Sequence, residues 1–406
     1  MSDPVHSAPD RDNGSFYRSL LPVLFVSLVF FSNYTDRAIL GPLLVHMEKD
    51  LGIDHVTSTS LLLFLSSGFC VGILFSGFAT ALIKPGRVIS FSAMGCGATL
   101  LFLSRLTTIG EARILFAILG LFGGFYLTAA MATLRSLVRP EDWSRAIAVH
   151  ELAPALSFIL SPLIAETAYA FWGWQGAMQG MGMVSLAIGG SFLLFGKGGS
   201  ETTDKPSLSG VIAGLRNPVL WVFMWMFALA VGGEFAPYSV LPLSLTAEQG
   251  FDSAEASRLL SLSRLACPFG VLFGGWAAMR LGAKRTIASF LLVHGLSLAA
   301  LSLPVSLVGK SGLFLAMTAQ GAASAFVFPA LFTLFARSFP YGQQAMLLAI
   351  AVPAATYLGT GCAPFLLGTA GEYWGFSYGY LAFGIICLAT LPVLLVSERN
   401  VNNDTA

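Results

Sequence analysis

The sequence reads ATALIKPGR at residues 79–87 and GWAAMRLGAKR at residues 275–285, and each stretch follows a long apolar run. Aligning Gly86 with Gly282 superposes the basic residues of the two stretches, and the separation is close to half of the 406-residue chain. A recurrence at half the chain length indicates a duplicated unit. Membrane transporters are commonly built from such internal repeats.

A second pair of segments supports the duplication. The sequence GPLL at residues 41–44, followed by Glu48, recurs as LPLS at residues 241–244, followed by Glu248. Both segments lie at the end of an apolar run. The two halves of the chain are therefore expected to fold alike.

Composition places the chain in a membrane. Hydrophobic residues make up 55% of it and charged residues 11%, against about 25% charged residues in soluble domains, and the mean hydropathy is +0.76.

The polar first fifteen residues predict no cleavable signal peptide. A net charge of +1 argues against nucleic-acid binding. The five cysteines lie in apolar runs without a CxxC motif, so we expect no disulfide, metal site or cofactor.

An apolar run of about 20 residues crosses a bilayer as a helix. The sequence therefore predicts an all-α membrane protein with twelve transmembrane helices, arranged as two six-helix bundles related by a pseudo-twofold axis. The expected spans are residues 20–45, 58–82, 88–105, 112–134, 146–165, 174–195, 218–245, 256–279, 286–307, 311–335, 344–367 and 376–396.

These spans divide the chain into five parts: an N-terminal tail (1–19), a first bundle (20–195), a polar connector (196–217), a second bundle (218–396) and a C-terminal tail (397–406). Fifteen Lys and Arg residues lie outside the spans on the side of the tails and connector, and five lie on the other side. Because cytoplasmic loops carry the excess of basic residues, both termini are expected in the cytoplasm.

This plan is similar to that of the major facilitator superfamily, whose loop signature is roughly G-x-x-x-D-R-x-G-R-K/R. Gly275, Arg280 and Gly282 match it in the second half, and Gly86 and Arg87 match it in the first. Both copies lack the signature Asp. The resemblance implies a secondary transporter that works by alternating access, not an enzyme, and we expect a monomer. The outer loops carry no glycosylation sequon, which favours a bacterial inner membrane.

Two arginines suggest a subfamily. The segment NYTDR at residues 33–37 resembles the N-Y-x-D-R segment of organic-anion symporters, which implies that Arg37 contacts the anionic group of the substrate. Arg264 in the eighth span is similar to the anion-binding arginine of oxalate and monocarboxylate carriers. The G-x-x-x-G-P motif of proton-driven drug exporters is absent from residues 156–162.

Charged residues inside the membrane are costly, at about 2.5–3.5 kcal/mol or more each, and usually serve function. Those expected here are Asp36, Arg37, Glu151, Glu234 and Arg264. A guanidinium presents a planar fork that matches a carboxylate, so both arginines are candidate anion ligands. The alternatives are that Arg37 pairs with Asp36 or Glu234, and that Arg264 pairs with Glu234.

Three acids against two arginines leave one acid in excess within the membrane. A carboxyl in a low-dielectric environment takes up a proton unless it is paired, so Asp36 and Glu234 are candidates for proton coupling. The alternative for each is a permanent ion pair. Glu151, near the cytoplasmic mouth, either relays protons or contacts Arg135 or Arg145 at a helix end.

Polar residues on the expected cavity helices complete the candidate site. Asn33 lies one turn before Arg37, and Tyr238 lies one turn after Glu234. Further candidates for substrate hydrogen bonds are Tyr126, Gln320 and Tyr357. Such side chains also hold membrane helices together, and that alternative stays open for each of them.

The sequence thus predicts proton-coupled symport of a small organic anion, a carboxylate, with protons and the lipid bilayer as the other partners. One alternative is proton-antiport efflux of a hydrophobic or cationic compound, with Glu234 contacting the cation. Another is a transport-silent sensor or lipid-handling protein on the same fold.

Overall fold

The computed structural model describes residues 16–199, 215–339 and 341–403, and the expected tails and connector lie partly outside them. The described part is helical almost throughout. In the first half of the chain the helices are α1 (Tyr17–Ala38), α2 (Leu40–Leu51), α3 (His55–Leu82), α4 (Pro85–Leu103), α5 (Ile109–Gly124), α6 (Tyr126–Leu137), the 3₁₀ turn η1 (Pro140–Asp142) and α7 (Trp143–Phe195).

The second half repeats this series of helices. Its elements are α9 (Pro218–Ala247), α10 (Ser253–Ser263), the 3₁₀ turn η2 (Arg264–Ala266), α11 (Cys267–Arg280), α12 (Ala283–Leu301), α13 (Val305–Ser338), α14 (Tyr341–Thr356), the π-helical turn η3 (Tyr357–Cys362), α15 (Ala363–Tyr373) and α16 (Phe376–Asn403). The last helix continues seven residues past the expected end of the twelfth span.

The twelve expected spans are all present. Ten stretches of the described chain are helices long and apolar enough to cross a membrane. One of them contains Gly173, whose φ of 68° and ψ of 176° reverse the chain, so that α7 supplies spans 5 and 6. The apolar part of α16, Phe376–Pro392, is the twelfth span. Only glycine adopts the backbone conformation found at Gly173 without strain.

Local sequence fixes where the helices begin. Asp54 caps α3 by accepting a hydrogen bond from the Thr57 N–H at 2.7 Å, and Asp252 caps α10 in the same way. Thr108 and Glu111 form a capping box at the start of α5. Each cap satisfies backbone N–H groups that have no partner within the helix.

Small residues let the helices of each bundle approach closely. A Cβ atom on Gly68 of α3 would lie 1.8 Å from the Ala117 carbonyl oxygen of α5, and one on Gly120 of α5 would lie 1.9 Å from the Leu65 carbonyl oxygen of α3. The equivalent helices of the second half, α11 and α13, meet in the same manner at Gly270. Because lipid offers no hydrophobic drive for helix association, such packing of small residues holds membrane helices together.

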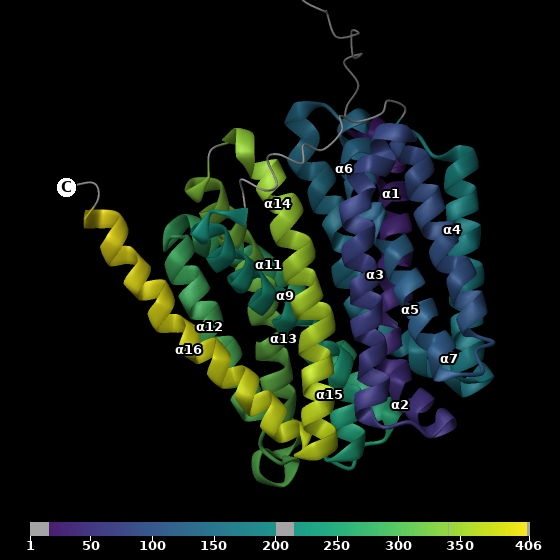
Figure 1. Cartoon of the computed structure of the whole chain (residues 1–406), viewed down its shortest axis with the longest axis vertical. Helices are drawn as coiled ribbons and strands as arrows, with labels where there is room; N and C mark the ends of the chain where they lie inside the picture. Colours follow the sequence, from purple (N-terminus) through teal and green to yellow (C-terminus); the bar gives the residue numbers. More distant parts are fainter. Residues whose placement is uncertain (1–15, 200–214, 340, 404–406) are drawn as a thin grey trace, which may run out of the picture.

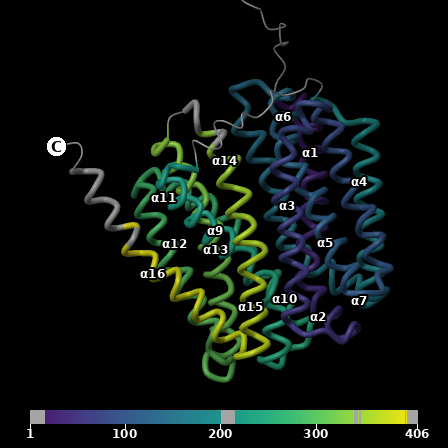
Figure 2. Tube along the Cα trace, in the orientation of Figure 1, coloured from purple at the N-terminus to yellow at the C-terminus, as the bar shows by residue number. Residues whose placement is uncertain are grey.

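The two halves form separate bundles, with the N-terminal half in purple and blue and the C-terminal half in teal to yellow (Figures 1 and 2). We call the face with the loops at residues 52–54 and 374–375 the outer face, and the opposite face the inner face, after the orientation expected from the basic residues. In Figure 1 the bundles converge at the lower, outer end, where α2 and α15 lie, and diverge toward the upper, inner end.

The repeat holds for the helices but not for every residue of the aligned loops. Gly86 lies inside α4, which begins at Pro85. Gly282 precedes α12 and has a φ of 90°. The two glycines therefore do not occupy equivalent positions, although the loops that carry them join equivalent helices.

Candidate functional site

Arg37 lies on α1 at the surface where the two bundles meet. Of the residues that the structure describes, its guanidinium bonds only to Asn33, with Nε 3.3 Å from the backbone oxygen and Nη2 3.4 Å from the side-chain oxygen. The guanidinium carbon lies 4.2 Å from the ring centre of Phe69 and 4.9 Å from that of Tyr34. No ion pair of Arg37 with an acid occurs within the described residues.

Arg37 lines a small cavity to which both bundles contribute. The cavity measures about 30 Å³, enough for about two water molecules. Its polar lining consists of Arg37 and hydroxyl groups, and the rest of the lining is apolar or aromatic. The lining residues are Arg37, Ala38, Leu62, Leu65, Ser66 and Phe69 from the first half, and Phe235, Tyr238, Ser239 and Thr360 from the second.

Arg264 occupies a different environment inside the second bundle. It lies in η2, where span 8 is interrupted, and is 1% exposed. None of its three side-chain nitrogens has a hydrogen-bond partner in the described part of the chain. Its guanidinium packs on Gly321 of α13, where a Cβ would lie 2.5 Å from Nη1. A buried cation without a partner is costly, so this site is electrostatically incomplete.

Tyr238 connects the two arginine environments. Its ring borders the cavity of Arg37, and the ring centre lies 5.6 Å from the guanidinium carbon of Arg264. Tyr238 also packs edge-on against Phe158 of the first bundle, with 4.6 Å between ring centres. Tyr238 therefore lies beside both arginine environments, and Arg264 is not among the described residues that line the cavity.

Asp36 points away from the cavity into the first bundle. It is fully buried, and both carboxyl oxygens bond to the Ser185 hydroxyl at 2.7 and 2.8 Å. Ser185 in turn bonds to Ser32 at 2.7 Å. No basic side chain belongs to this described network, so Asp36 does not pair with Arg37.

Glu234 and Glu151 differ in their surroundings. Glu234 is half-buried on α9, and no hydrogen bond or ion pair joins it to Arg264. Glu151 is exposed and contacts the buried His150, with Oε1 3.2 Å from Nδ1. Among the described residues it forms no ion pair with Arg135 or Arg145; Arg145 pairs with Asp142, and Arg135 packs over the ring of Trp143.

Tyr126 is buried within the first bundle and does not line the cavity. Its hydroxyl donates to the Val26 carbonyl oxygen at 2.8 Å and lies 3.1 Å from Nε2 of His150. Phe30 stacks on both rings. This arrangement gives Tyr126 a packing role and connects it to Glu151 through His150.

Gln320 is buried between helices of the second bundle. Its side-chain nitrogen donates to the Gly233 carbonyl oxygen and to the Ser324 hydroxyl, while Oε1 has no partner in the described structure. Ser324 also bonds to His294 at 3.3 Å. Gln320 thus holds α13 against α9.

Tyr357 is half-buried at the start of η3. The following turn of η3 reaches the first bundle, because Thr360 bonds to Ser66 at 2.8 Å and a Cβ on Gly361 would lie 2.7 Å from the Ser66 side chain. Short π-helical turns are frequent at functional sites, and this one carries Thr360 into the cavity.

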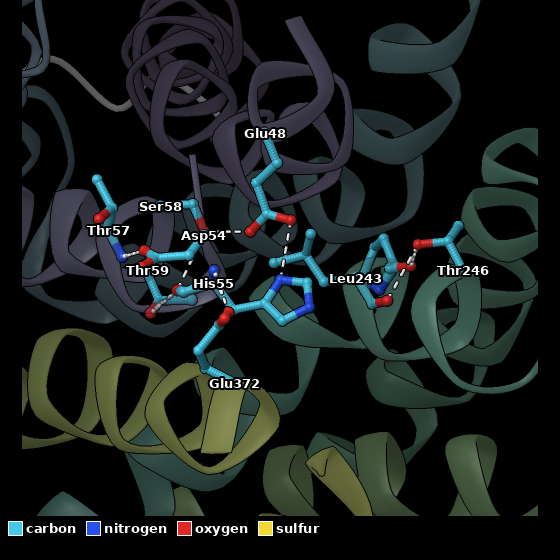
Figure 3. A network of polar contacts seen from close by, with 10 residues as sticks. Glu48, Asp54, His55, Thr57, Ser58, Thr59, Leu243, Thr246 and Glu372 are labelled. Atoms are coloured by element: carbon cyan, nitrogen blue, oxygen red, sulfur yellow. Dashed lines mark hydrogen bonds and ion pairs between the residues drawn. The ribbon is translucent and has the colours of Figure 1, made fainter. Parts of the chain in front are cut away.

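A polar network closes the outer face (Figure 3). His55 bonds through Nδ1 to Glu48 at 2.9 Å, and its backbone N–H donates to Glu372 of the other bundle at 2.9 Å. Ser58 donates to the second oxygen of Glu48. Hydrogen bonds from Thr57 hold the pKa of Asp54 below its ordinary value, so the stabilisation by this cap is present near neutral pH and lost in strong acid.

A second contact between the bundles centres on Glu166 of α7. Its carboxylate accepts hydrogen bonds from Ser253 at 3.1 Å and Ser257 at 3.3 Å, both on α10. It also contacts His46 of α2 at 2.9 Å. All side-chain hydrogen bonds between the bundles in the described structure lie between mid-membrane and the outer face. The structure is therefore closed toward the outer face.

Replacing the central carboxylate should loosen this closure. We expect Glu166→Gln to weaken the contact by about 1–3 kcal/mol, because it removes charge-assisted bonds across the interface. Spin labels at Lys49 and Tyr373, both exposed at the outer helix ends, should then report a longer mean distance.

The matched control for this prediction is Glu255→Gln. Glu255 pairs with Lys310 at 2.6 Å on the outer face but within one bundle, so the distance should not change. An equal lengthening in both variants would contradict the role given to Glu166.

Sequence reasoning missed the outer network and the aromatic surroundings of Arg37. Glu166, Glu48 and Glu372 lie at or beyond the expected span ends, and nothing in the sequence brings these distant segments together. His46 and His55 were the sequence signal for the outer network. They lie near Glu48 and Asp54 on either side of the loop at residues 52–54, and histidines close to acidic residues indicate a polar contact.

Comparison with known proteins identifies the fold. The profile described as Major Facilitator Superfamily matches residues 26–243 and again residues 223–405, while no curated protein matches by sequence. A bacterial homologue of the human lysosomal transporter Spinster, inward-facing and occupied, superposes with a TM-score of 0.79 at 12% identity, over 95% of this chain and 98% of that one.

Two further solved structures have the same architecture. A mutant of the nucleoside transporter NupG has a TM-score of 0.79 at 14% identity, over 92% of this chain and 99% of that one. A POT family transporter in complex with a conjugated peptide has a TM-score of 0.76 at 13% identity, over 95% and 96%. Because the family profile covers almost the whole chain and the fold agrees, this protein is a member of the major facilitator superfamily and a multi-pass membrane transporter.

Proposed function

We propose that this transporter imports a small organic anion, a monocarboxylate, together with a proton. The observation that carries the proposal is the unpaired guanidinium of Arg37 beside a cavity formed by both bundles. Two of its three nitrogens bond to the neutral Asn33. Nη1 has no hydrogen-bond partner among the described residues, so a donor is free for an anion.

The lining of the cavity supports a single carboxylate with an apolar body. One cation and the hydroxyl-bearing residues Ser66, Tyr238, Ser239 and Thr360 supply the polar lining, and the remaining walls come from Leu, Phe and Ala side chains. A second carboxylate would have to be buried against apolar walls, which is costly. The cavity is too small for an organic solute in this conformation, so the bundles must move apart to admit one, as alternating access requires.

Arg264 is assigned a later role in the cycle. Its nitrogens have no hydrogen-bond partner among the described residues, and its guanidinium carbon lies 5.6 Å from the ring centre of Tyr238, a residue that lines the cavity. We propose that this ring turns aside before an anion reaches them. We propose that Arg264 attracts the anion electrostatically in the conformation that is closed toward the outer face. It contacts the anion directly once Tyr238 has moved.

Transport in proteoliposomes tests the function. Labelled monocarboxylates with short, long and aromatic bodies are offered under an imposed inward proton gradient, with a dicarboxylate for comparison. We expect accumulation of a monocarboxylate that a protonophore abolishes. Accumulation of cations or of uncharged amphiphiles under the opposite, outward proton gradient, with no anion flux, would instead support proton-antiport efflux of hydrophobic or cationic compounds.

Asp36 and Glu234 are the proposed proton carriers, and neutral variants separate them. If Asp36 carries the proton, Asp36→Asn should abolish gradient-driven accumulation and retain substrate exchange between equal pools, because exchange needs no net proton movement. If Glu234 carries the proton instead, Glu234→Gln should lose gradient-driven accumulation and retain exchange. The readouts are gradient-driven uptake and counterflow in the same vesicles, and full accumulation in both variants would exclude both acids.

A further inference from the structure

The inner face of the second bundle has an open groove that the transport mechanism does not use. It lies between the loop joining α11 to α12 and the end of α13, and its volume is about 310 Å³. Its lining includes Lys284, Arg285 and Arg337 and no acidic residue. None of the three forms an ion pair within the described chain.

The first bundle shows what a filled groove of this kind looks like. There the equivalent position, between the loop joining α3 to α4 and the end of α6, holds Gly198 and Gly199. Gly199 is buried, donates to the Ser136 hydroxyl at 2.8 Å, and accepts from the Gly86 N–H at 3.4 Å. Gly198 lies against Leu137. The chain itself thus occupies the groove of the first bundle.

The two grooves also differ in charge where they correspond in structure. Ser136, one residue before the end of α6, faces the filled groove. Arg337, one residue before the end of α13, lines the open one. A neutral hydroxyl suits a backbone amide, whereas three cations in an open groove suit an anion.

The surroundings of the open groove indicate which kind of anion. Leu281 lines it and is 49% exposed, and Met279, on the preceding turn of α11, is 81% exposed. Because these apolar side chains lie at the end of a membrane span, we expect them to meet lipid tails and the three cations to lie at headgroup level. Basic pockets between transmembrane helices at such a position bind anionic lipid headgroups.

We propose that this groove binds the phosphodiester headgroup of an anionic phospholipid from the inner leaflet, with the acyl chains along Leu281 and Met279. Lys284, Arg285 and Arg337 contact the phosphate oxygens. The bound lipid ties the α11–α12 loop to α13, as Gly198 and Gly199 tie the matching elements of the first bundle. The site does not depend on which substrate is transported.

Thermal unfolding of the purified protein in mixed micelles tests the site. Phosphatidylglycerol, phosphatidylcholine, soluble glycerol phosphate and inorganic phosphate are added separately. We expect phosphatidylglycerol alone to raise the unfolding midpoint, and high salt to reduce the shift because it screens exposed charges.

The decisive variant is the triple change Lys284→Gln, Arg285→Gln and Arg337→Gln. Each basic side chain near an anionic surface contributes about fivefold to affinity, so losing three should weaken phosphatidylglycerol binding on the order of a hundredfold. The matched control is Lys84→Gln with Arg87→Gln in the loop of the first bundle, which should keep the full shift.

Two further outcomes decide the proposal. Arg285→Lys with Arg337→Lys preserves the charge and should keep the shift, which separates lost binding from misfolding in the triple variant. A full phosphatidylglycerol shift in the triple variant overturns the site. So does an equal shift with glycerol phosphate or inorganic phosphate, since the groove would then bind a free phosphate and not a lipid.

Discussion

Arg37→Ala is expected to lower uptake of the anionic substrate about a hundredfold or more. Removing one partner of a desolvated charge pair costs about 2–5 kcal/mol, and Arg37 is the only cation among the described residues that line the cavity between the bundles. Arg37→Lys should lose about tenfold, because an ammonium keeps the charge but not the planar fork. Initial uptake rates in proteoliposomes over a range of substrate concentrations measure both effects.

Arg113 provides a matched control for this prediction. Its guanidinium carbon lies 5.8 Å from the ring centre of Phe64, so it also packs on a phenylalanine, but it does not line the cavity. Arg113→Ala should leave uptake close to that of the unmodified protein. If Arg37→Ala transports as well as Arg113→Ala does, the anion site must lie elsewhere.

Gly120→Val is expected to prevent correct packing of the first bundle. The added Cβ would lie 1.9 Å from the Leu65 carbonyl oxygen, and backbone atoms of α3 cannot move aside without separating two spans. Overpacking of this kind costs about 1–3 kcal/mol and more when backbone is displaced. We expect loss of the monodisperse peak in size-exclusion chromatography and a lower thermal midpoint.

Gly190→Val is the control for helix propensity and side-chain size. Gly190 also lies within a membrane span, on α7, but a Cβ there meets nothing within 4 Å. This variant should fold and elute normally. Equal damage in both variants would show that valine itself, and not the contact between α3 and α5, causes the defect.

The twelve spans were predictable because their signal is local. A run of about 20 apolar residues has few alternatives to a helix in lipid, since every backbone polar group must be satisfied within the segment. The repeated loops at residues 79–87 and 275–285 added the division into two halves. Even the reversal between spans 5 and 6 has a local cause, the glycine at position 173.

The candidate site was only partly predictable. Sequence position marked Asp36, Arg37, Glu234 and Arg264 as intramembrane charges, but it left open whether Arg37 pairs with Asp36 or Glu234 and whether Arg264 pairs with Glu234. Asp36 and Arg37 are adjacent, yet neighbouring residues of a helix point about 100° apart. As a result Asp36 faces Ser185 inside one bundle, while Arg37 faces the cavity between bundles.

What the sequence determined by itself is therefore the membrane location and the twelve helices, because each depends on residues near one another in the chain, together with the duplication, because two distant loops repeat the same local pattern. Tertiary structure alone decided that Arg264 is buried beside Tyr238, that Glu166 and His55 close the outer face, and that one of two equivalent grooves stays open. The contacts between the bundles that close the outer face join segments more than 80 residues apart in the chain. Which side chains meet is set by the packing of whole helices, and no local pattern encodes it.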